Sequence, residues 1–135
     1  MKRKMRIILL ILAAVIVVCV FGGIIAFQSI QRNLSVLASS VIEDVPLERV
    51  QDGVYVGEYS AFPVTAQVEV TVKDHALASA RTLKHQHGQG SAGEAVVEKA
   101  VQRNSLQVDA VTGATYSSKV LLKAMENALR KGLAP

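Results

Sequence analysis

Residues 109–119 read DAVTGATYSSK and combine one glycine with a run of short hydroxyl side chains. The stretch stands directly before an amphipathic segment, so it should form the entrance of a helix. The first turn of a helix offers unpaired N–H groups and the positive end of the helix dipole, which together bind phosphate. The same hydroxyls could serve as an ordinary Ser or Thr cap. The residues alone favour a phosphate site and a simple cap about equally.

A second glycine-rich stretch, GQGSAG at residues 88–93, matches the G-x-G-x-x-G pattern of dinucleotide-binding proteins, and Asp109 follows at about the expected spacing. However, the segment before it carries Ser79 and Arg81, whereas the strand that precedes such a motif is normally buried on both faces. The chain also has room for only one βαβ unit. We therefore interpret residues 88–93 as a flexible loop that approaches a bulky ligand.

His85 and His87 flank the start of this loop. Two histidines in an H-x-H pattern are a familiar pair of metal ligands, but a stable site needs at least a third ligand. No third ligand is evident in the sequence. We therefore expect no metal site.

Three strands should precede the loop. Residues 64–73 alternate apolar and polar side chains without exception, which is typical of an antiparallel strand with one buried face. Residues 53–62 are rich in Val, Tyr and Phe, and residues 76–85 predict a weaker third strand. Asp74 and His75, between the second and third strands, tolerate the backbone angles of a tight turn.

Two helices should complete the domain. Residues 117–131 carry an apolar stripe at helical spacing and end before Gly132, and residues 94–104 predict a shorter helix. Residues 105–111 between them predict a brief strand or an extended entry. The stripe consists of Leu121, Ala124, Met125, Ala128 and Leu129. The predicted fold is a small α+β domain of βββαβα order, an antiparallel sheet packed with two helices.

The N-terminal part differs from the domain in composition. Residues 1–6 are basic, and residues 7–27 carry no charge over a length that suffices for a transmembrane helix of about 20 residues. The basic residues should stay in the cytoplasm, which places the rest outside it. A cleaved signal peptide is the alternative, although the apolar run is long and no A-x-A cleavage signal follows it. Residues 28–51 predict a stalk, and residues 52–135 the folded domain.

The net charge of +4 comes entirely from Lys2, Arg3, Lys4 and Arg6, because the remaining Lys and Arg equal the Asp and Glu in number. The domain is therefore neutral and has few aromatic residues, which argues against a nucleic-acid-binding surface, so we expect no nucleic-acid partner. Cys19 is the single cysteine and cannot form a disulfide within the chain.

From residue 52 onward, the chain resembles the FMN-binding domain family. This family includes the covalently flavinylated subunits of sodium-pumping quinone reductases and of Rnf-type complexes. Residues 109–115 match its D-x-x-[ST]-G-A-T pattern, and residues 52–57 match its D-G-x-Y-x-G opening. His85 and Gly90 resemble positions of its middle loop. The resemblance covers about residues 52–131.

The resemblance implies that FMN is joined through its phosphate to Thr115. A separate flavin transferase would form the ester, with FAD as the donor and Mg²⁺ as its metal. Asp109 would serve in recognition by the transferase or would fix the turn. The other residues expected at the cofactor are Thr112, Gly113, Ala114, Ser117 and Ser118 around the phosphate, and His85, Gly88 and Gly90 over the isoalloxazine ring.

The expected function is that of a membrane-anchored, extracytoplasmic flavoprotein that relays electrons between redox partner proteins. In such a protein the flavin carries the redox chemistry, and the chain supplies binding and orientation. We expect a component of an electron-transfer system rather than a complete enzyme. Two alternatives stay open: a module that binds or senses FMN without a covalent bond, and a structural domain that binds no flavin.

Overall fold

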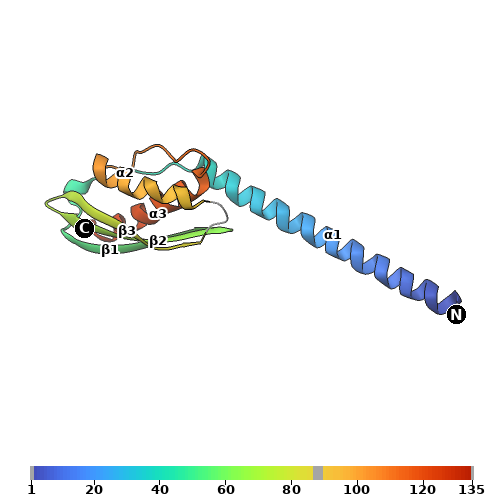
Figure 1. The fold of residues 1–135 in the computed structure, drawn as a ribbon. Helices are drawn as coiled ribbons and strands as arrows, with labels where there is room; N and C mark the ends of the chain where they lie inside the picture. Colours follow the sequence, from blue (N-terminus) through green and yellow to red (C-terminus); the bar gives the residue numbers. More distant parts are fainter. Residues whose placement is uncertain (1, 87–89, 135) are drawn as a thin grey trace. The chain divides into compact units, whose positions relative to one another are not determined.

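The computed structural model describes residues 2–86 and 90–134, and the chain divides into two compact units, Met1–Arg32 and Asn33–Pro135. The helix α1 (Lys2–Ser39) begins in the first unit (Figure 1). All residues from 2 to 29 are exposed, which excludes a helix packed inside a protein core. Within the described residues, α1 is the one helix apolar and long enough to cross a membrane, and an 18-residue window of it has a mean hydropathy of 3.3. A signal sequence meets the same criterion.

The second unit is built on an antiparallel sheet of three strands in the order β1-β2-β3. The strands are β1 (Gly53–Ala61), β2 (Val64–Lys73) and β3 (Ala76–Gln86). The turn between β2 and β3 consists of Asp74 and His75, both with positive φ, as a two-residue hairpin requires. The three predicted strands are therefore confirmed, each within a residue or two of the expected bounds.

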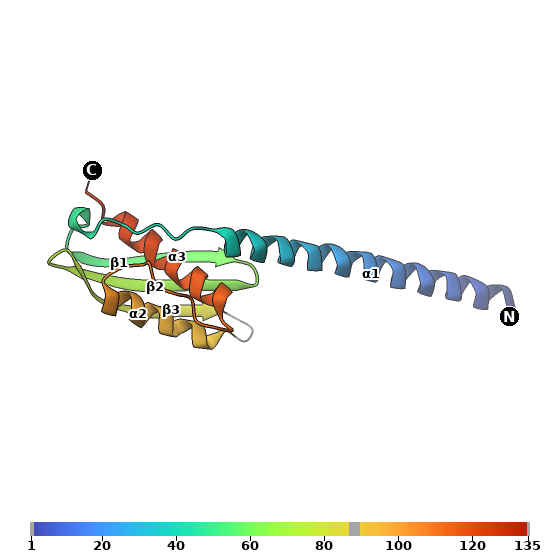
Figure 2. The same ribbon diagram turned by 90° about the horizontal axis from the view of Figure 1, so that it is seen from above.

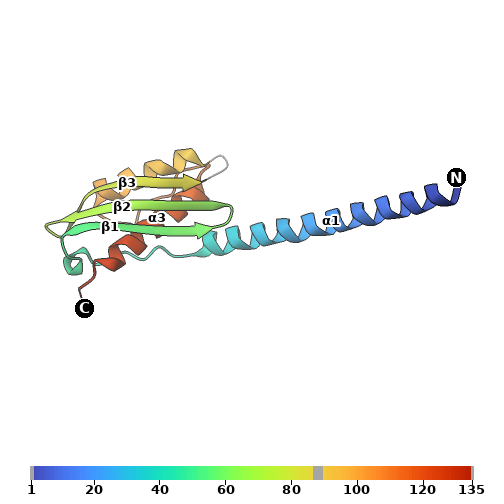
Figure 3. The same cartoon turned by 90° about the horizontal axis from the view of Figure 1, so that it is seen from below.

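Two helices, α2 (Ala95–Arg103) and α3 (Thr115–Lys131), lie on one face of the sheet (Figure 2). The opposite face carries neither of them (Figure 3). The predicted alternation of β2 is confirmed, because its apolar side chains are buried beneath the helices. The predicted stripe of α3 is confirmed as well, since all five of its residues are buried. The domain is thus an α+β fold with one core between the sheet and the two helices.

Residues 105–111 form an extended connection without strand pairing, so the order in the described residues is three strands followed by the helices. The reason is that a side chain accepts a backbone N–H of this segment, which a neighbouring strand would otherwise accept. Asp44 accepts the N–H of Leu106 at 3.0 Å and the hydroxyl of Ser105 at 2.7 Å. We expected either a brief strand or an extended entry for this segment, and the extended entry is observed. The fourth strand of the predicted βββαβα order is therefore absent there.

The segment before β1 is part of the domain rather than a separate spacer. Leu37, Val45, Leu47 and Val50 are buried in the same core cluster as the sheet and α3. A short 3-10 helix, η1 (Leu47–Arg49), is followed by a backbone bridge between Val50 and Leu133 near the C-terminal end. The compact unit therefore begins at Asn33, earlier than the boundary that we expected near residue 52.

Candidate functional site

The helix α3 begins at Thr115 and is preceded by a closed turn. Gly113 has a φ of +80°, which a glycine adopts without strain. The N–H of Ala114 donates to the carbonyl of Val111 at 2.9 Å. The N–H of Val111 in turn donates to the hydroxyl of Ser118 at 3.0 Å. These bonds hold the backbone of the motif in one conformation at the start of the helix.

The first turn of α3 is open to a ligand. The N-cap residue is Ala114, which has no side-chain cap. The first backbone N–H of α3 with a partner in the described part of the chain is that of Ser118, which donates to the carbonyl of Ala114 at 2.9 Å. The N–H groups of Thr115, Tyr116 and Ser117 therefore have no acceptor among the described residues. Three free donors at the positive end of a helix are suited to a phosphate.

Thr115 is the first residue of the helix and not its cap. The residue is exposed, and its hydroxyl makes no hydrogen bond with any other described residue. The alternative of an ordinary threonine cap is therefore wrong for this residue. Its hydroxyl is accessible to a reaction partner next to the three free N–H groups.

A surface pocket of about 180 Å³ lies at this helix start. It is open to solvent, so a ligand much larger than the pocket can rest partly outside it. The pocket is lined by Val64 at the start of β2, by Gly90, and by five successive residues of the motif, Gly113, Ala114, Thr115, Tyr116 and Ser117. Most of its surface is apolar, which suits the edge of a flat aromatic ring system beside a phosphate.

The last glycine of the G-x-G-x-x-G pattern has a packing role. Gly93 lies in the short 3-10 helix η2 (Ser91–Glu94) and is buried. A Cβ at Gly93 would lie 2.8 Å from the Cβ of Ser117 and 3.1 Å from the N of Ser118. The glycine therefore lets η2 approach the first turn of α3. The antiparallel sheet also confirms that the pattern does not mark a dinucleotide-binding fold.

His85 lies in β3 and not in the loop. Its side chain is 2 % exposed, and Nδ1 lies 3.0 Å from Oε1 of Glu94 in η2. This contact joins the end of the sheet to the element that packs on α3. His85 does not line the pocket at Thr115. His87 and Gly88 lie outside the described residues. In the described part of the chain, no group of three or more metal-ligating side chains occurs.

The structure places some of the residues expected at the cofactor around the pocket and others outside it. Gly113, Ala114, Thr115, Ser117 and the loop residue Gly90 are brought together around the pocket. Thr112 is exposed in the turn but does not line the pocket. Ser118 is 0 % exposed and accepts the N–H of Val111 in the turn, so its side chain is buried and does not line the pocket.

Asp109 lies apart from Thr115. It lines a different pocket, together with residues of α2, and forms no hydrogen bond or ion pair with any described residue. The turn is instead closed by Val111 and Ser118. The idea that Asp109 fixes the turn therefore receives no support, and recognition by another protein stays as its predicted role.

Two residues that line the pocket were not expected there. Val64 reads in sequence as one more apolar residue of the alternating strand, and Tyr116 carries no local signal of its own. The pairing of β1 with β2 sets the position of Val64, because Ala61 and Val64 are opposite each other at the end of the hairpin. The packing of α3 on β2, which joins residues far apart in the sequence, places this strand next to the start of α3.

The opening D-G-x-Y-x-G residues position α3 and do not reach the pocket. The carboxylate of Asp52 accepts the N–H groups of Asp74 at 3.0 Å and His75 at 3.4 Å. The bond from Asp74 is the main reason that the pKa of Asp52 lies below its ordinary value. At Gly57, an added Cβ would lie 2.0 Å from the carbonyl oxygen of Ala124 in α3. The helix thus rests directly on the backbone of β1.

Charged side chains fix the other contacts of α3. Glu126 is 3 % exposed and accepts bonds from Lys123 at 2.8 Å, from Arg130 at 3.1 Å and from the N–H of Glu43 at 3.2 Å. Lys119 donates to the carbonyl of Ser40 at 3.1 Å and to that of Ala38. The ammonium of Lys119 therefore compensates the carbonyl end of α1 rather than lying in solvent.

Comparison with known proteins identifies the family of the chain. The family model of the FMN-binding domain matches residues 63–130, just over half of the chain, and the chain therefore belongs to the FMN-binding domain family. FMN is the cofactor that this membership defines. No curated protein and no solved structure matches the chain. The three free N–H groups and the glycine turn fit the phosphate of FMN, and the apolar pocket fits part of its ring.

Proposed function

We propose that this chain carries FMN as a phosphodiester on Thr115. The observation that supports the proposal is the exposed, unbonded hydroxyl of Thr115 beside three free backbone N–H groups in the first turn of α3. An ester phosphate on this oxygen keeps one negative charge. That charge would lie at the positive end of the helix dipole, which stabilises it.

The attachment requires a flavin transferase with FAD and Mg²⁺. The hydroxyl oxygen of Thr115 forms a bond to the phosphorus of FAD on the riboflavin side. The bond from that phosphorus to the AMP half breaks, AMP leaves, and the hydroxyl proton passes to a base of the transferase. No oxidant or reductant is consumed. The chain gains the mass of FMN less one water.

The bound flavin would supply the redox chemistry, and the chain would bind and orient the flavin. Gly90 and residues 113–117 would hold the phosphate and one side of the ring, while the open side of the pocket leaves the rest accessible to partner proteins. We propose that the protein relays electrons between redox partners as a component of a larger system. A covalent bond is useful in an exported carrier, because a tethered cofactor is not lost to the medium and its effective concentration stays at millimolar or above.

We further propose that α1 anchors the domain outside the cytoplasm. The basic residues at its start support this orientation, because cytoplasmic flanks are enriched in Lys and Arg. Labelling in intact cells tests it. Ser79 is exposed in β3, so a chain with Ser79→Cys and Cys19→Ala carries one accessible thiol in the domain. A membrane-impermeant maleimide should label it without lysis, and labelling only after lysis contradicts the orientation.

A non-covalent FMN module is the second candidate, and the exposed pocket is compatible with it. Denaturation separates the two. The chain is co-expressed with a flavin transferase, purified, unfolded in urea and washed. The covalent carrier stays yellow, and a non-covalent module loses its colour in the wash. Expression without the transferase serves as the control and should give a colourless chain.

A further inference from the structure

Tyr116 directly follows Thr115 in the chain and lines the same pocket. It is the one aromatic residue among the described residues that line this pocket. Tyr116 is 40 % exposed, whereas the next two residues of α3, Ser117 and Ser118, are buried. The tyrosine therefore lies at the surface of the domain, at the pocket, and the two serines point into the fold.

The side chain of Tyr116 is not used by the described fold as the other two tyrosines are. Its hydroxyl forms no hydrogen bond with another described residue, whereas the hydroxyl of Tyr55 donates to the carbonyl of Gln51 at 2.8 Å. Tyr55 and Tyr59 are packed against the core cluster, and Tyr116 is outside it. An aromatic side chain gains much from burial against a flat partner. A ligand in the pocket can be that partner.

We propose that the phenol ring of Tyr116 contacts the isoalloxazine ring of the flavin on Thr115, an inference that rests on the proposed function. Tyr116 then serves the cofactor twice, because its backbone N–H is one of the three free donors at the phosphate. The ribityl chain between phosphate and ring is flexible, so the ester bond alone leaves the ring mobile. Contact with a side chain in the first turn of α3 orients the ring for electron transfer.

Phe62 is the competing aromatic residue. It is 64 % exposed in the turn between β1 and β2, two residues before the pocket residue Val64. A flavin ring that extends toward this turn would rest on Phe62 instead of Tyr116. Phe62 itself does not line the pocket, which favours Tyr116. The two positions differ in chemistry, because only Tyr116 carries a phenol.

Flavin fluorescence reports on this difference. A photoexcited flavin takes one electron from a phenol that it touches, and the electron then returns to the phenol. The excitation is lost without emission of light, and nothing is consumed. A phenylalanine ring does not donate an electron in this way. Tyr116→Phe therefore removes the quenching group but keeps the aromatic ring, and it removes no hydrogen bond within the described residues.

The test uses the full-length chain, co-expressed with a flavin transferase and purified in detergent. The flavin fluorescence of the folded chain is divided by that of the same sample unfolded in urea, which corrects for the amount of attached flavin. The wild-type ratio should be low, because Tyr116 quenches the folded state. The ratio of Tyr116→Phe should be severalfold higher. If the ring rests on Phe62 instead, the wild type is weakly quenched and Phe62→Tyr lowers its ratio.

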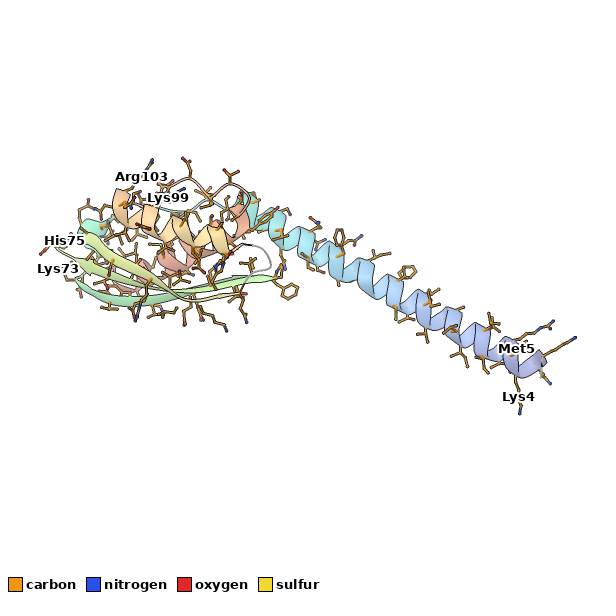
Figure 4. All side chains as sticks on the ribbon, viewed as in Figure 1. Lys4, Met5, Lys73, His75, Lys99 and Arg103 are labelled. Atoms are coloured by element: carbon orange, nitrogen blue, oxygen red, sulfur yellow. The ribbon has the colours of Figure 1, made fainter. Side chains whose placement is uncertain are left out.

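The matched control is Tyr55→Phe, the same change away from the pocket. Tyr55 is paired with Val70 in the sheet. This pair is toward the end of the sheet at which Figure 4 shows Lys73 and His75, and the pocket lies at the opposite end. The fluorescence ratio of Tyr55→Phe should therefore equal that of the wild type.

Three results overturn the contact with Tyr116: a wild type that is not quenched, a Tyr116→Phe variant with the wild-type ratio, or an equal rise in Tyr55→Phe. Each of them leaves the flavin carrier intact, because the unfolded samples still show the attached flavin. If the wild-type chain carries no flavin at all, both proposals fail.

Discussion

The hydroxyl of Ser118 accepts the backbone N–H of Val111 at 3.0 Å, so a side chain of α3 closes the turn that leads into α3. Ser118 is completely buried, and the N–H of the same residue donates to Ala114 at 2.9 Å. Thr115 lies inside the loop that these two bonds close. The position of its hydroxyl is therefore set by bonds within the motif.

Replacing Ser118 by alanine should destabilise the domain by about 1–2 kcal/mol, because the N–H of Val111 loses its acceptor. Urea unfolding of the full-length chain, followed by tyrosine fluorescence, measures this change. The chain has no tryptophan and all three of its tyrosines lie in the domain, so the signal reports on the domain alone. Ser79→Ala is the control, an exposed serine that should cost less than about 0.5 kcal/mol. Equal stability of the two variants would show that the bond does not hold the turn.

Gly57→Ala should be more damaging than any change at the pocket. The new Cβ would lie 2.0 Å from the carbonyl oxygen of Ala124 and 2.4 Å from the N of Ala128, and neither backbone atom can rotate away. We expect a loss of about 3 kcal/mol or more in the same unfolding measurement.

Gly53→Ala in the same strand provides the comparison, because the three atoms nearest to its Cβ all belong to the flexible side chain of Tyr55, the nearest at 3.2 Å. Its cost should be clearly smaller. If Gly57→Ala lowers the free energy of unfolding no more than Gly53→Ala does, α3 does not pack directly on the backbone of β1 at Gly57.

Stability should decrease in acid, in part through Glu126. Burial alone would raise the pKa of this carboxyl, but Lys123, the N–H of Glu43 and Arg130 outweigh burial and hold it below the ordinary value of 4.5. The folded chain thus binds this proton less readily than the unfolded chain. The stabilising contribution is present above about pH 4.5 and is lost as the pH falls through the folded pKa.

Glu126→Gln isolates this effect. The variant should be less stable than the wild type at pH 7, and the difference between them should shrink as the pH is lowered below 4.5, the ordinary value of the carboxyl. Unfolding curves at a series of pH values measure the difference. A difference that stays constant with pH would mean that the charge of Glu126 contributes nothing to the fold.

Much of the fold could be predicted from local patterns. The alternation of residues 64–73 and the stripe from Leu121 to Leu129 reflect burial that repeats along a single element, so they appear directly in the sequence. The turn at Asp74 and His75 was predictable from residue type, because Asp and His tolerate a positive φ better than most residues. The expected helix at residues 117–131 is confirmed, with a start two residues earlier, at Thr115.

The remaining features depend on contacts between distant residues. Asp44 takes the backbone bond of Leu106 across 62 positions, which turns an expected strand into an extended connection. Leu37 is buried in the domain core, although its own segment reads as a spacer. The resemblance placed His85 in a loop over the ring, but His85 lies in β3, which continues to Gln86, and its side chain is buried. No local pattern specifies these partners.

The most direct test of the account is the intact mass of the chain after co-expression with a flavin transferase. We predict a gain equal to FMN less one water in the wild type and in Thr112→Ala, whose exposed side chain does not line the pocket. Thr115→Ala should show no gain, because it lacks the hydroxyl that accepts the phosphate. An unmodified wild-type chain, or a flavin that persists in Thr115→Ala, would contradict the assignment.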